Sequence, residues 1–173
     1  MDKFISRNLY GETAMKNEKA LIVVDMQEDY IGESSRYNYY PNLLVDKVNE
    51  RIVSADRAGV LVIYVKNTGR RNKEPYVSDF VKGLAIVSKC WIEKGKSSVF
   101  ADNTLLELLK NEGISQVEVI GIDGNCCVAS SALEASKLGF SVVFPLEYIG
   151  IKDKRRFLKT KEKLLDSNVE IVE

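Results

Sequence analysis

Short apolar runs alternate with amphipathic segments along this chain, and this alternation limits the fold more than any other feature. Continuous runs of Ile, Val and Leu are typical of strands buried on both faces. They predict strands at residues 20–26, 60–65, 88–94, 116–122, 140–145 and 169–172. Segments with helical apolar spacing lie between most of them, at residues 43–59, 104–113, 127–139 and 152–168. The pattern predicts a three-layer α/β/α fold with a six-stranded, mainly parallel, Rossmann-like sheet.

A chain of 173 residues, 45% apolar and 29% charged, suits one globular domain. We therefore expect a single domain over residues 1–173, in which the aperiodic residues 1–18 form an N-terminal arm. Lys plus Arg equals Asp plus Glu at 25 each, so no net charge attracts nucleic acid or an anionic membrane. No apolar run approaches the roughly 20 residues that span a bilayer, and the N-terminus lacks the apolar core of a signal peptide. We expect a cytoplasmic protein without nucleic-acid or membrane partners.

Polar residues close three of the predicted strands. Asp25 ends the first, Lys94 ends the third, and the fourth is followed by Asp123, Cys126 and Cys127. Parallel strands end at one edge of a sheet, and ligands bind there near the point where the strand order reverses, so these side chains should converge. Each has a simpler explanation: the carboxylate could cap a turn, the lysine could be solvated, and a cysteine could fill the core. The combination is more specific than its parts.

The chain contains three cysteines and no histidine. Ser-His-Asp and Cys-His catalysis are therefore excluded, as are zinc sites that need histidine or four cysteines. A thiol at a helix N-terminus beside an ammonium group can still be activated as a thiolate, with a carboxylate as proton acceptor. These considerations leave Cys126 and Cys127 both open as the nucleophile, whereas Cys90, inside a predicted strand, is expected to be buried and inert.

Three segments, in this order, carry a resemblance to a known family. "LIVVDMQEDY" (21–30) resembles an opening strand that ends in Asp-x-Gln-x-Asp-Phe, and "EKGKSSVF" (93–100) resembles a Lys-x-x-x-Ser-Ala-Phe element. "GIDGNCCVASSALEASKLGFSV" (121–142) resembles a Gly-x-x-Thr-Asp-x-Cys-Val element. Together they resemble the isochorismatase-like cysteine hydrolases over residues 19 to about 150. The resemblance implies the same fold and a hydrolase of small amide-type C–N bonds.

The resemblance places a catalytic triad on Asp25, Lys94 and Cys127, because a valine follows the nucleophile in the family as it follows Cys127 here. It also implies a cis peptide bond between Ile122 and Asp123, with the backbone N–H groups of Asp123 and Cys127 forming an oxyanion hole. Asp25, helped by Lys94, would take the proton of Cys127. The thiolate would then attack the substrate carbonyl and form a thioester, which water hydrolyses.

The resemblance further implies a small-molecule amide substrate and assembly as a homodimer or homotetramer. Because the chain has no histidine, we expect no metal, and we expect no other cofactor. The family's Thr-Asp pair is replaced here by Gly124-Asn125, and no Asp-x-His-x-x-His cluster of the zinc-dependent nicotinamidases follows the second predicted strand. Two alternatives remain open. One is an isochorismatase-type vinyl-ether hydrolase, which needs an acid rather than a cysteine. The other is a non-catalytic or redox-sensing binding protein, suggested by the adjacent Cys126 and Cys127 and by Asn125.

Four residues are candidates for substrate binding. Gln27 and Tyr30 follow Asp25 in the first motif, Trp91 shares a predicted strand with Lys94, and Asn125 precedes the paired cysteines. The tyrosine-rich segment "RYNYYPN" (36–42) could line the same pocket or pack at a subunit interface.

Overall fold

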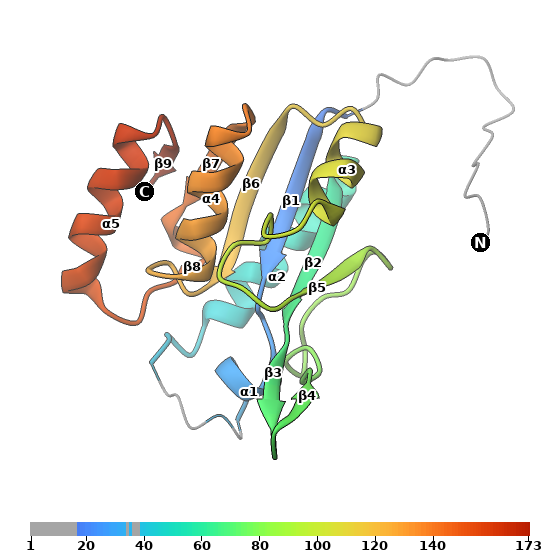
Figure 1. Ribbon diagram of the computed structural model, residues 1–173, viewed down its shortest axis with the longest axis vertical. Helices are drawn as coiled ribbons and strands as arrows, with labels where there is room; N and C mark the ends of the chain where they lie inside the picture. The colour runs from blue at the N-terminus through green and yellow to red at the C-terminus, as the bar shows by residue number, and fades with distance from the viewer. Residues whose placement is uncertain (1–16, 34, 36–38) are drawn as a thin grey trace, which may run out of the picture.

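The computed structural model describes residues 17–33, 35 and 39–173, so the expected N-terminal arm lies almost entirely outside the described residues. A central sheet runs in the order β5-β2-β1-β6-β7-β9, and β8 also pairs with β6 (Figure 1). Every pairing between these strands is parallel, which confirms the α/β fold and adds a seventh strand to the six expected. The strands are β1 (Lys19–Val24), β2 (Leu61–Asn67), β5 (Trp91–Lys94), β6 (Gln116–Ile122), β7 (Ser141–Pro145), β8 (Ile149–Gly150) and β9 (Glu170–Val172).

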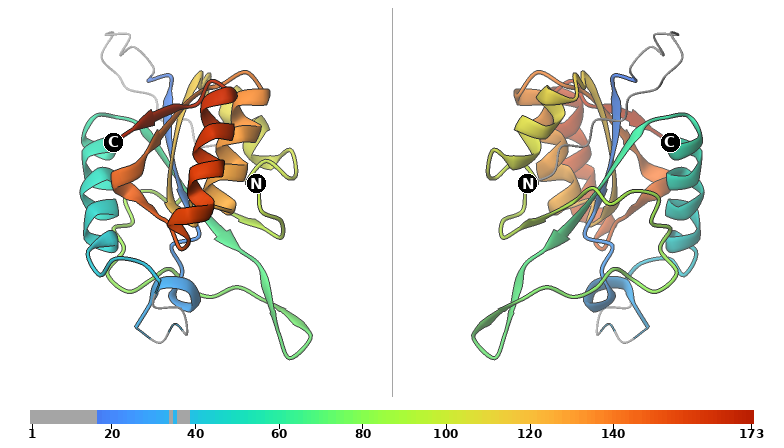
Figure 2. Two further views of the ribbon diagram at one scale, coloured as in Figure 1. Left: turned by 90° about the vertical axis from the view of Figure 1, so that its left-hand side faces the viewer. Right: turned by 90° about the vertical axis from the view of Figure 1, so that its right-hand side faces the viewer.

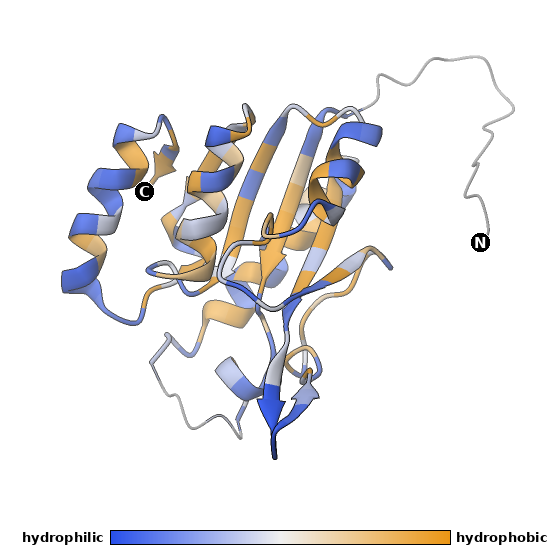
Figure 3. Ribbon diagram, viewed as in Figure 1, coloured by the Kyte–Doolittle hydropathy of each residue, from blue (hydrophilic) through white to orange (hydrophobic). Residues whose placement is uncertain are grey.

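Helices cover both faces of the sheet (Figure 2). Helix α2 (Leu44–Arg57) packs on one face, and α3 (Thr104–Asn111), α4 (Cys127–Lys137) and α5 (Lys154–Asp166) pack on the other. Apolar and polar residues alternate along the helices, whereas the central strands are apolar along most of their length (Figure 3). The buried helix residues are mostly apolar, as Leu44, Leu105 and Phe157 show. Burial of these two apolar faces against one sheet is what selects the three-layer arrangement.

The polar segment 66–75, which has no strand pattern in the sequence, leads into a hairpin of β3 (Gly69–Arg71) and β4 (Glu74–Tyr76) that projects beyond the sheet (Figure 1). Its turn residues, Asn72 and Lys73, have φ angles of 52° and 70°. Two successive positive φ values match the twist of paired strands, and Asn adopts them readily. Two further short elements were not expected, α1 (Glu28–Ile31) and the 3₁₀ turn η1 (Leu146–Tyr148).

The strand order places a site at one edge of the sheet. The chain builds β1, β2 and β5 outward in one direction, and then crosses back to place β6 on the other side of β1. The order therefore reverses between β1 and β6, and such reversal points open a crevice at the carboxyl ends of the strands. In the described part of the chain no helix is long and apolar enough to cross a membrane.

Candidate active site

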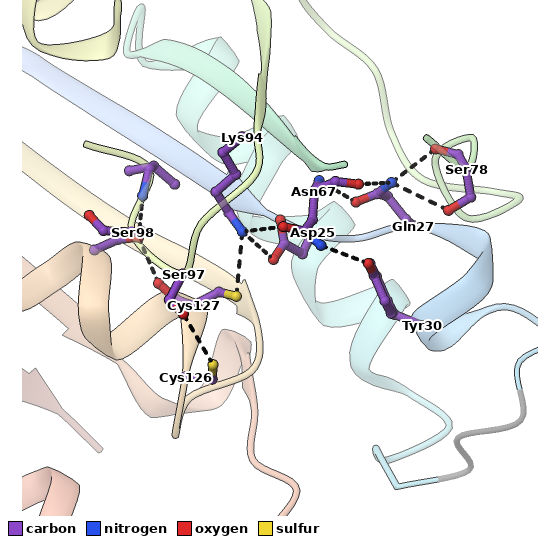
Figure 4. Close-up of polar contacts among 12 residues, drawn as sticks. Asp25, Gln27, Tyr30, Asn67, Ser78, Lys94, Ser97, Ser98, Cys126 and Cys127 are labelled. Carbon is purple, nitrogen blue, oxygen red and sulfur yellow. Dashed lines mark hydrogen bonds and ion pairs between the residues drawn. The ribbon is translucent and has the colours of Figure 1, made fainter. Parts of the chain in front are cut away.

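Asp25 and Lys94 form a buried ion pair at this edge. Lys94 ends β5, and its Nζ donates a hydrogen bond of 2.8 Å to Oδ2 of Asp25, the residue that follows β1 (Figure 4). The side chains of Lys94 and Asp25 are only 2% and 5% exposed. Asp25 adopts φ 53°, a left-handed conformation that costs energy in most residues and that Asp tolerates better than most. Oδ1 of Asp25 is buried and has no hydrogen-bond partner among the described residues.

Of the two adjacent cysteines, Cys127 is the one beside the ion pair. It is the first residue of α4, and its Sγ accepts a hydrogen bond of 3.4 Å from Lys94 Nζ. Cys126 is exposed, and its Sγ lies 3.8 Å from Oγ of Ser97 (Figure 4). The structure thus brings together the three side chains that the resemblance singled out, Asp25, Lys94 and Cys127.

The three groups shift one another's proton affinities. Burial raises the pKa of the Asp25 carboxyl above its ordinary value of 3.8, against the opposing pull of the Lys94 ammonium. Burial lowers the pKa of Lys94, but the Asp25 and Cys127 charges outweigh it and leave that pKa above 10.5. Burial and then the Asp25 charge raise the pKa of the Cys127 thiol above 9.0. These directions favour a protonated Cys127 thiol beside the Lys94 ammonium before substrate arrives.

The backbone just before Cys127 departs from regular structure and leaves N–H groups without an acceptor among the described residues. The Ile122–Asp123 peptide bond is cis, and the Asp123 carbonyl accepts hydrogen bonds from the N–H groups of Cys126 and Val128. Within the described residues, neither the Asp123 nor the Cys127 N–H has an acceptor in the protein. Unpaired N–H groups at the start of a helix are suited to hold a developing negative charge.

Gly121 allows the two strands that carry this machinery to approach. Its φ is 107°, and a Cβ at this position would lie 2.2 Å from the Val24 carbonyl oxygen. Only glycine fits, because the left-handed φ and the close backbone both exclude a side chain. The end of β6 therefore lies directly against the end of β1, one residue before Asp25.

A hydrogen-bond network extends the site along β1 and β2. Asn67, the last residue of β2, accepts a bond of 3.2 Å from Lys94 Nζ at Oδ1 and donates one of 2.8 Å from Nδ2 to the Tyr30 hydroxyl. The Gln27 side-chain amide brackets the Asn67 peptide, accepting from its N–H at 2.6 Å and donating to its C=O at 3.3 Å. Gln27 also donates to the Ser78 carbonyl at 3.0 Å. Lys94 thus uses all three ammonium protons within the protein.

A cavity of about 280 Å³ opens onto the thiol. Its size suits a small molecule, and Lys94 lies buried behind Asp25. Tyr39 and Tyr40 come from the tyrosine-rich segment, whose residues 36–38 are outside the described part of the chain. The lining residues are Asp25, Tyr30, Tyr39, Tyr40, Asn67, Ile122, Asp123, Cys126, Cys127 and Lys152.

Three of the four expected substrate-binding residues lie elsewhere. Gln27 is fully buried and braces the Asn67 peptide. Trp91 is 51% exposed on the edge strand β5, where the Lys66 ammonium lies 5.4 Å from its ring. Asn125 donates to the Asp153 carbonyl at 2.8 Å and thus faces the start of α5. Only Tyr30 lines the cavity. Gln27, Trp91 and Asn125 therefore stand outside this cavity, and their part in substrate binding stays a prediction.

Sequence reasoning missed Asn67 and Lys152. Asn67 closes the second strand, so the reasoning from strand ends that selected Asp25 applies equally to it. Lys152 follows β8, a strand of two residues that no apolar run in the sequence announces. The signal for Asn67 was present, whereas the place of Lys152 depends on how the chain folds back after η1.

The chain is similar in sequence to a known protein family. The isochorismatase family model, described as "Isochorismatase domain", matches residues 19–147. A streptothricin hydrolase of Streptomyces noursei is 28% identical over 132 residues, which are 73% of this chain and 48% of that protein. This chain spans about half the length of the streptothricin hydrolases that it matches.

Solved structures share the fold. The pyrazinamidase of Pyrococcus horikoshii, solved in complex with zinc, is 23% identical with a TM-score of 0.73, covering 90% of this chain and 99% of that one. The N-carbamoylsarcosine amidase of Thermoplasma acidophilum is 20% identical with a TM-score of 0.69, covering 89% of this chain and 95% of that one. This chain has no histidine, and its described residues contain no cluster of three or more acidic or cysteine side chains that could hold a metal. Its residues therefore do not fit a zinc ion.

Proposed function

The chain belongs to the isochorismatase family, and on this premise we propose that it is a cysteine-dependent hydrolase of small amide C–N bonds. One observation carries the proposal: Lys94 Nζ lies within hydrogen-bond distance of both the Asp25 carboxylate and the Cys127 sulfur, beside a cavity of small-molecule size. A nucleophile, a base and a cation in mutual contact are the parts that covalent catalysis requires.

The first half of the reaction transfers the acyl group to sulfur. Oδ1 of Asp25 accepts the proton of Cys127, and its raised pKa makes the carboxylate a stronger base. The thiolate attacks the amide carbonyl carbon, and the backbone N–H groups of Asp123 and Cys127 bind the oxyanion. Asp25 returns the proton to the departing nitrogen, so the C–N bond breaks, ammonia or an amine leaves, and a thioester on Cys127 remains.

The second half regenerates the enzyme. Asp25, again a carboxylate, takes a proton from a water molecule that attacks the thioester carbonyl. The C–S bond breaks, the proton returns to sulfur, and the carboxylic acid is released. Throughout, the Lys94 ammonium stabilises the negative charge that alternates between Asp25 and Cys127. The neutral resting thiol is consistent with this sequence, because the proton moves only when substrate is attacked.

The test is ammonia release from a panel of small primary amides, carbamoyl compounds and nicotinamide. We expect at least one to be hydrolysed, and Cys127→Ala to lower kcat by about 10³–10⁶-fold, as loss of a covalent nucleophile does elsewhere. Cys90→Ala is the control for loss of a thiol, because Cys90 packs against the core outside the cavity. Intact-protein mass spectrometry should detect an acyl adduct on Cys127 during turnover.

Three results would overturn the proposal. One is ammonia release by Cys127→Ala at an unchanged rate. Another is a protein that hydrolyses none of the amides but cleaves a vinyl ether, which would assign the acid chemistry of Asp25 instead. The third is a protein that binds panel members and transforms none of them, which would be a binding relative.

A further inference from the structure

Two hydrogen bonds link Lys94 through the Asn67 side chain to Tyr30, and chemistry fixes which atom donates in each. An ammonium group can donate but not accept, so the Asn67 atom that lies 3.2 Å from Lys94 Nζ must be the carbonyl oxygen Oδ1. The other end of the Asn67 amide is then the NH₂ group, which donates to Tyr30 Oη at 2.8 Å. The Tyr30 oxygen therefore accepts this bond, and its own proton must point elsewhere.

The Asn67 amide is held in this orientation from two sides. Gln27 brackets the Asn67 backbone with bonds of 2.6 Å and 3.3 Å, and Gln27 is itself fully buried and tied to Ser78. Reversal of the amide would point its NH₂ group at the Lys94 ammonium, which is electrostatically unfavourable. Asn67 is thus a positioning residue: Lys94 fixes the orientation of the Asn67 amide, and that amide makes the Tyr30 oxygen a hydrogen-bond acceptor.

Among the described residues the Tyr30 hydroxyl has no acceptor for its own proton. Tyr30 lines the cavity together with Asp25 and Cys127, and its hydroxyl makes no hydrogen bond in the described residues except the one from Asn67. Burial raises the pKa of Tyr30, so the hydroxyl stays protonated. The nearby Asp123 carboxylate is occupied by the N–H groups of Asn125 at 2.7 Å and of Lys152 at 2.8 Å.

From this geometry we infer that Tyr30 is a fixed hydrogen-bond donor to the substrate and selects amides that carry a hydrogen-bond acceptor near the scissile carbonyl. The acceptor is a neutral or anionic oxygen or an aromatic ring nitrogen. An amide without one leaves the Tyr30 hydroxyl without an acceptor once the ligand displaces water from it, and a site built to donate rejects such a ligand. The inference rests on the proposed function, because it assumes that the amide lies against Cys127.

Binding to the Cys127→Ala protein tests the inference without turnover. Isothermal titration calorimetry compares matched pairs: the three pyridinecarboxamide isomers against benzamide, and methoxyacetamide against butanamide. In each pair a nitrogen replaces a CH group or an oxygen replaces a CH₂ group, so size is kept. We expect the acceptor-bearing member, for at least one isomer or ether, to bind about 3- to 10-fold tighter, the value of one hydrogen bond.

Two variants in the same background identify the donor. Tyr30→Phe should equalise the two members of each pair, while Tyr39→Phe, which removes a different tyrosine hydroxyl from the cavity lining, should keep the preference. Asn67→Asp should reverse it. A carboxylate accepts from both Lys94 and Tyr30, so the Tyr30 lone pairs would face the cavity and favour 3-aminobenzamide over the pyridine compounds. If Asn67 had a purely structural role, Asn67→Asp would weaken the binding of all these ligands alike.

The inference is overturned if no acceptor-bearing amide binds more tightly than its partner, or if the preference survives Tyr30→Phe. These outcomes are distinct from failure of the proposed function. Ammonia release without an acceptor preference would sink the inference alone. A Tyr30-dependent preference in binding, with no amide hydrolysed by the unaltered protein, would sink the proposed function alone.

Discussion

Lys94 and Asp25 form an ion pair of 2.8 Å in which both side chains are almost completely buried. Two charges taken out of water are tolerable only when each neutralises the other and the remaining donors are satisfied. Lys94 meets this condition through Asn67 and Cys127, whereas Asp25 keeps one oxygen, Oδ1, without a partner. All three ammonium protons of Lys94 are therefore donated, whereas the Asp25 carboxylate keeps one oxygen that can accept a proton.

Removal of one partner should destabilise the fold more than removal of both. Lys94→Met leaves the Asp25 carboxylate buried and unpaired and should cost about 3–5 kcal/mol of unfolding free energy, measured by urea denaturation. Asp25→Asn/Lys94→Met should cost less than Lys94→Met, because no charge remains. Lys47→Met is the control: its partner Glu147 lies 3.2 Å away with both side chains about half exposed, so it should cost about 1 kcal/mol or less. A double variant that lost as much as Lys94→Met would contradict this account.

Asp25→Asn should make Cys127 more reactive toward iodoacetamide and at the same time abolish hydrolysis. Burial and, after it, the Asp25 charge hold the pKa of the Cys127 thiol up; removal of that charge lowers the pKa and lets the Lys94 ammonium stabilise more thiolate. Tandem mass spectrometry at pH 8 can follow alkylation of Cys127 against the neighbouring exposed Cys126 as internal reference. In the unaltered protein Cys126 should be alkylated first. Equal labelling of Cys127 in both proteins would show that Asp25 does not control the thiol.

The raised thiol pKa predicts a loss of stability at alkaline pH. Below pH 9.0 the thiol is protonated in both the folded and the unfolded chain. Above it the unfolded chain releases the proton and the folded chain keeps it, so the unfolded state binds fewer protons and unfolding becomes easier. The slope is about 1.4 kcal/mol per pH unit until the folded pKa is reached. Cys127→Ser lacks this titration, so its unfolding free energy should fall less steeply between pH 9 and 10.5. Parallel curves would disprove the shift.

Gly121→Ala should damage both stability and activity. A Cβ would lie 2.2 Å from the Val24 carbonyl at a φ of 107°, which should cost about 2–5 kcal/mol and displace the end of β1, with Asp25. Gly59 is the matched control: its φ is 69°, but a Cβ there meets no atom within 4 Å. Gly59→Ala should cost about 1–2 kcal/mol and leave kcat unchanged. Denaturation and ammonia release on both variants test the difference.

The fold was largely predictable because apolar periodicity reports burial directly. Residues 20–26 and 116–122 read as buried strands, and the structure places β1 and β6 there, side by side. The hairpin of β3 and β4 was missed because its strands are polar and three residues long, and only the φ angles of Asn72 and Lys73 reveal it. The two-residue β8 is too short to carry any pattern.

The site was predictable in part for a related reason. Asp25 and Lys94 stand at the ends of parallel strands, so topology alone brings them to one edge. Gln27, Trp91 and Asn125 do not line the cavity, because closeness in sequence to a strand end does not fix which way a side chain points. Gln27 turns inward to the Asn67 peptide, and Asn125 turns to Asp153.

The sequence by itself determined the layered architecture and placed Asp25, Lys94 and the paired cysteines at the carboxyl ends of the strands. Both follow from the spacing of residue types along one chain. The tertiary structure decided which cysteine contacts Lys94, how strongly the Cys127 thiol holds its proton, and from which residue the Tyr30 hydroxyl accepts a hydrogen bond. These three depend on distances between groups far apart in sequence and on how much water reaches them. Electrostatic and hydrogen-bond energies change steeply with both, and no pattern of residue types records either.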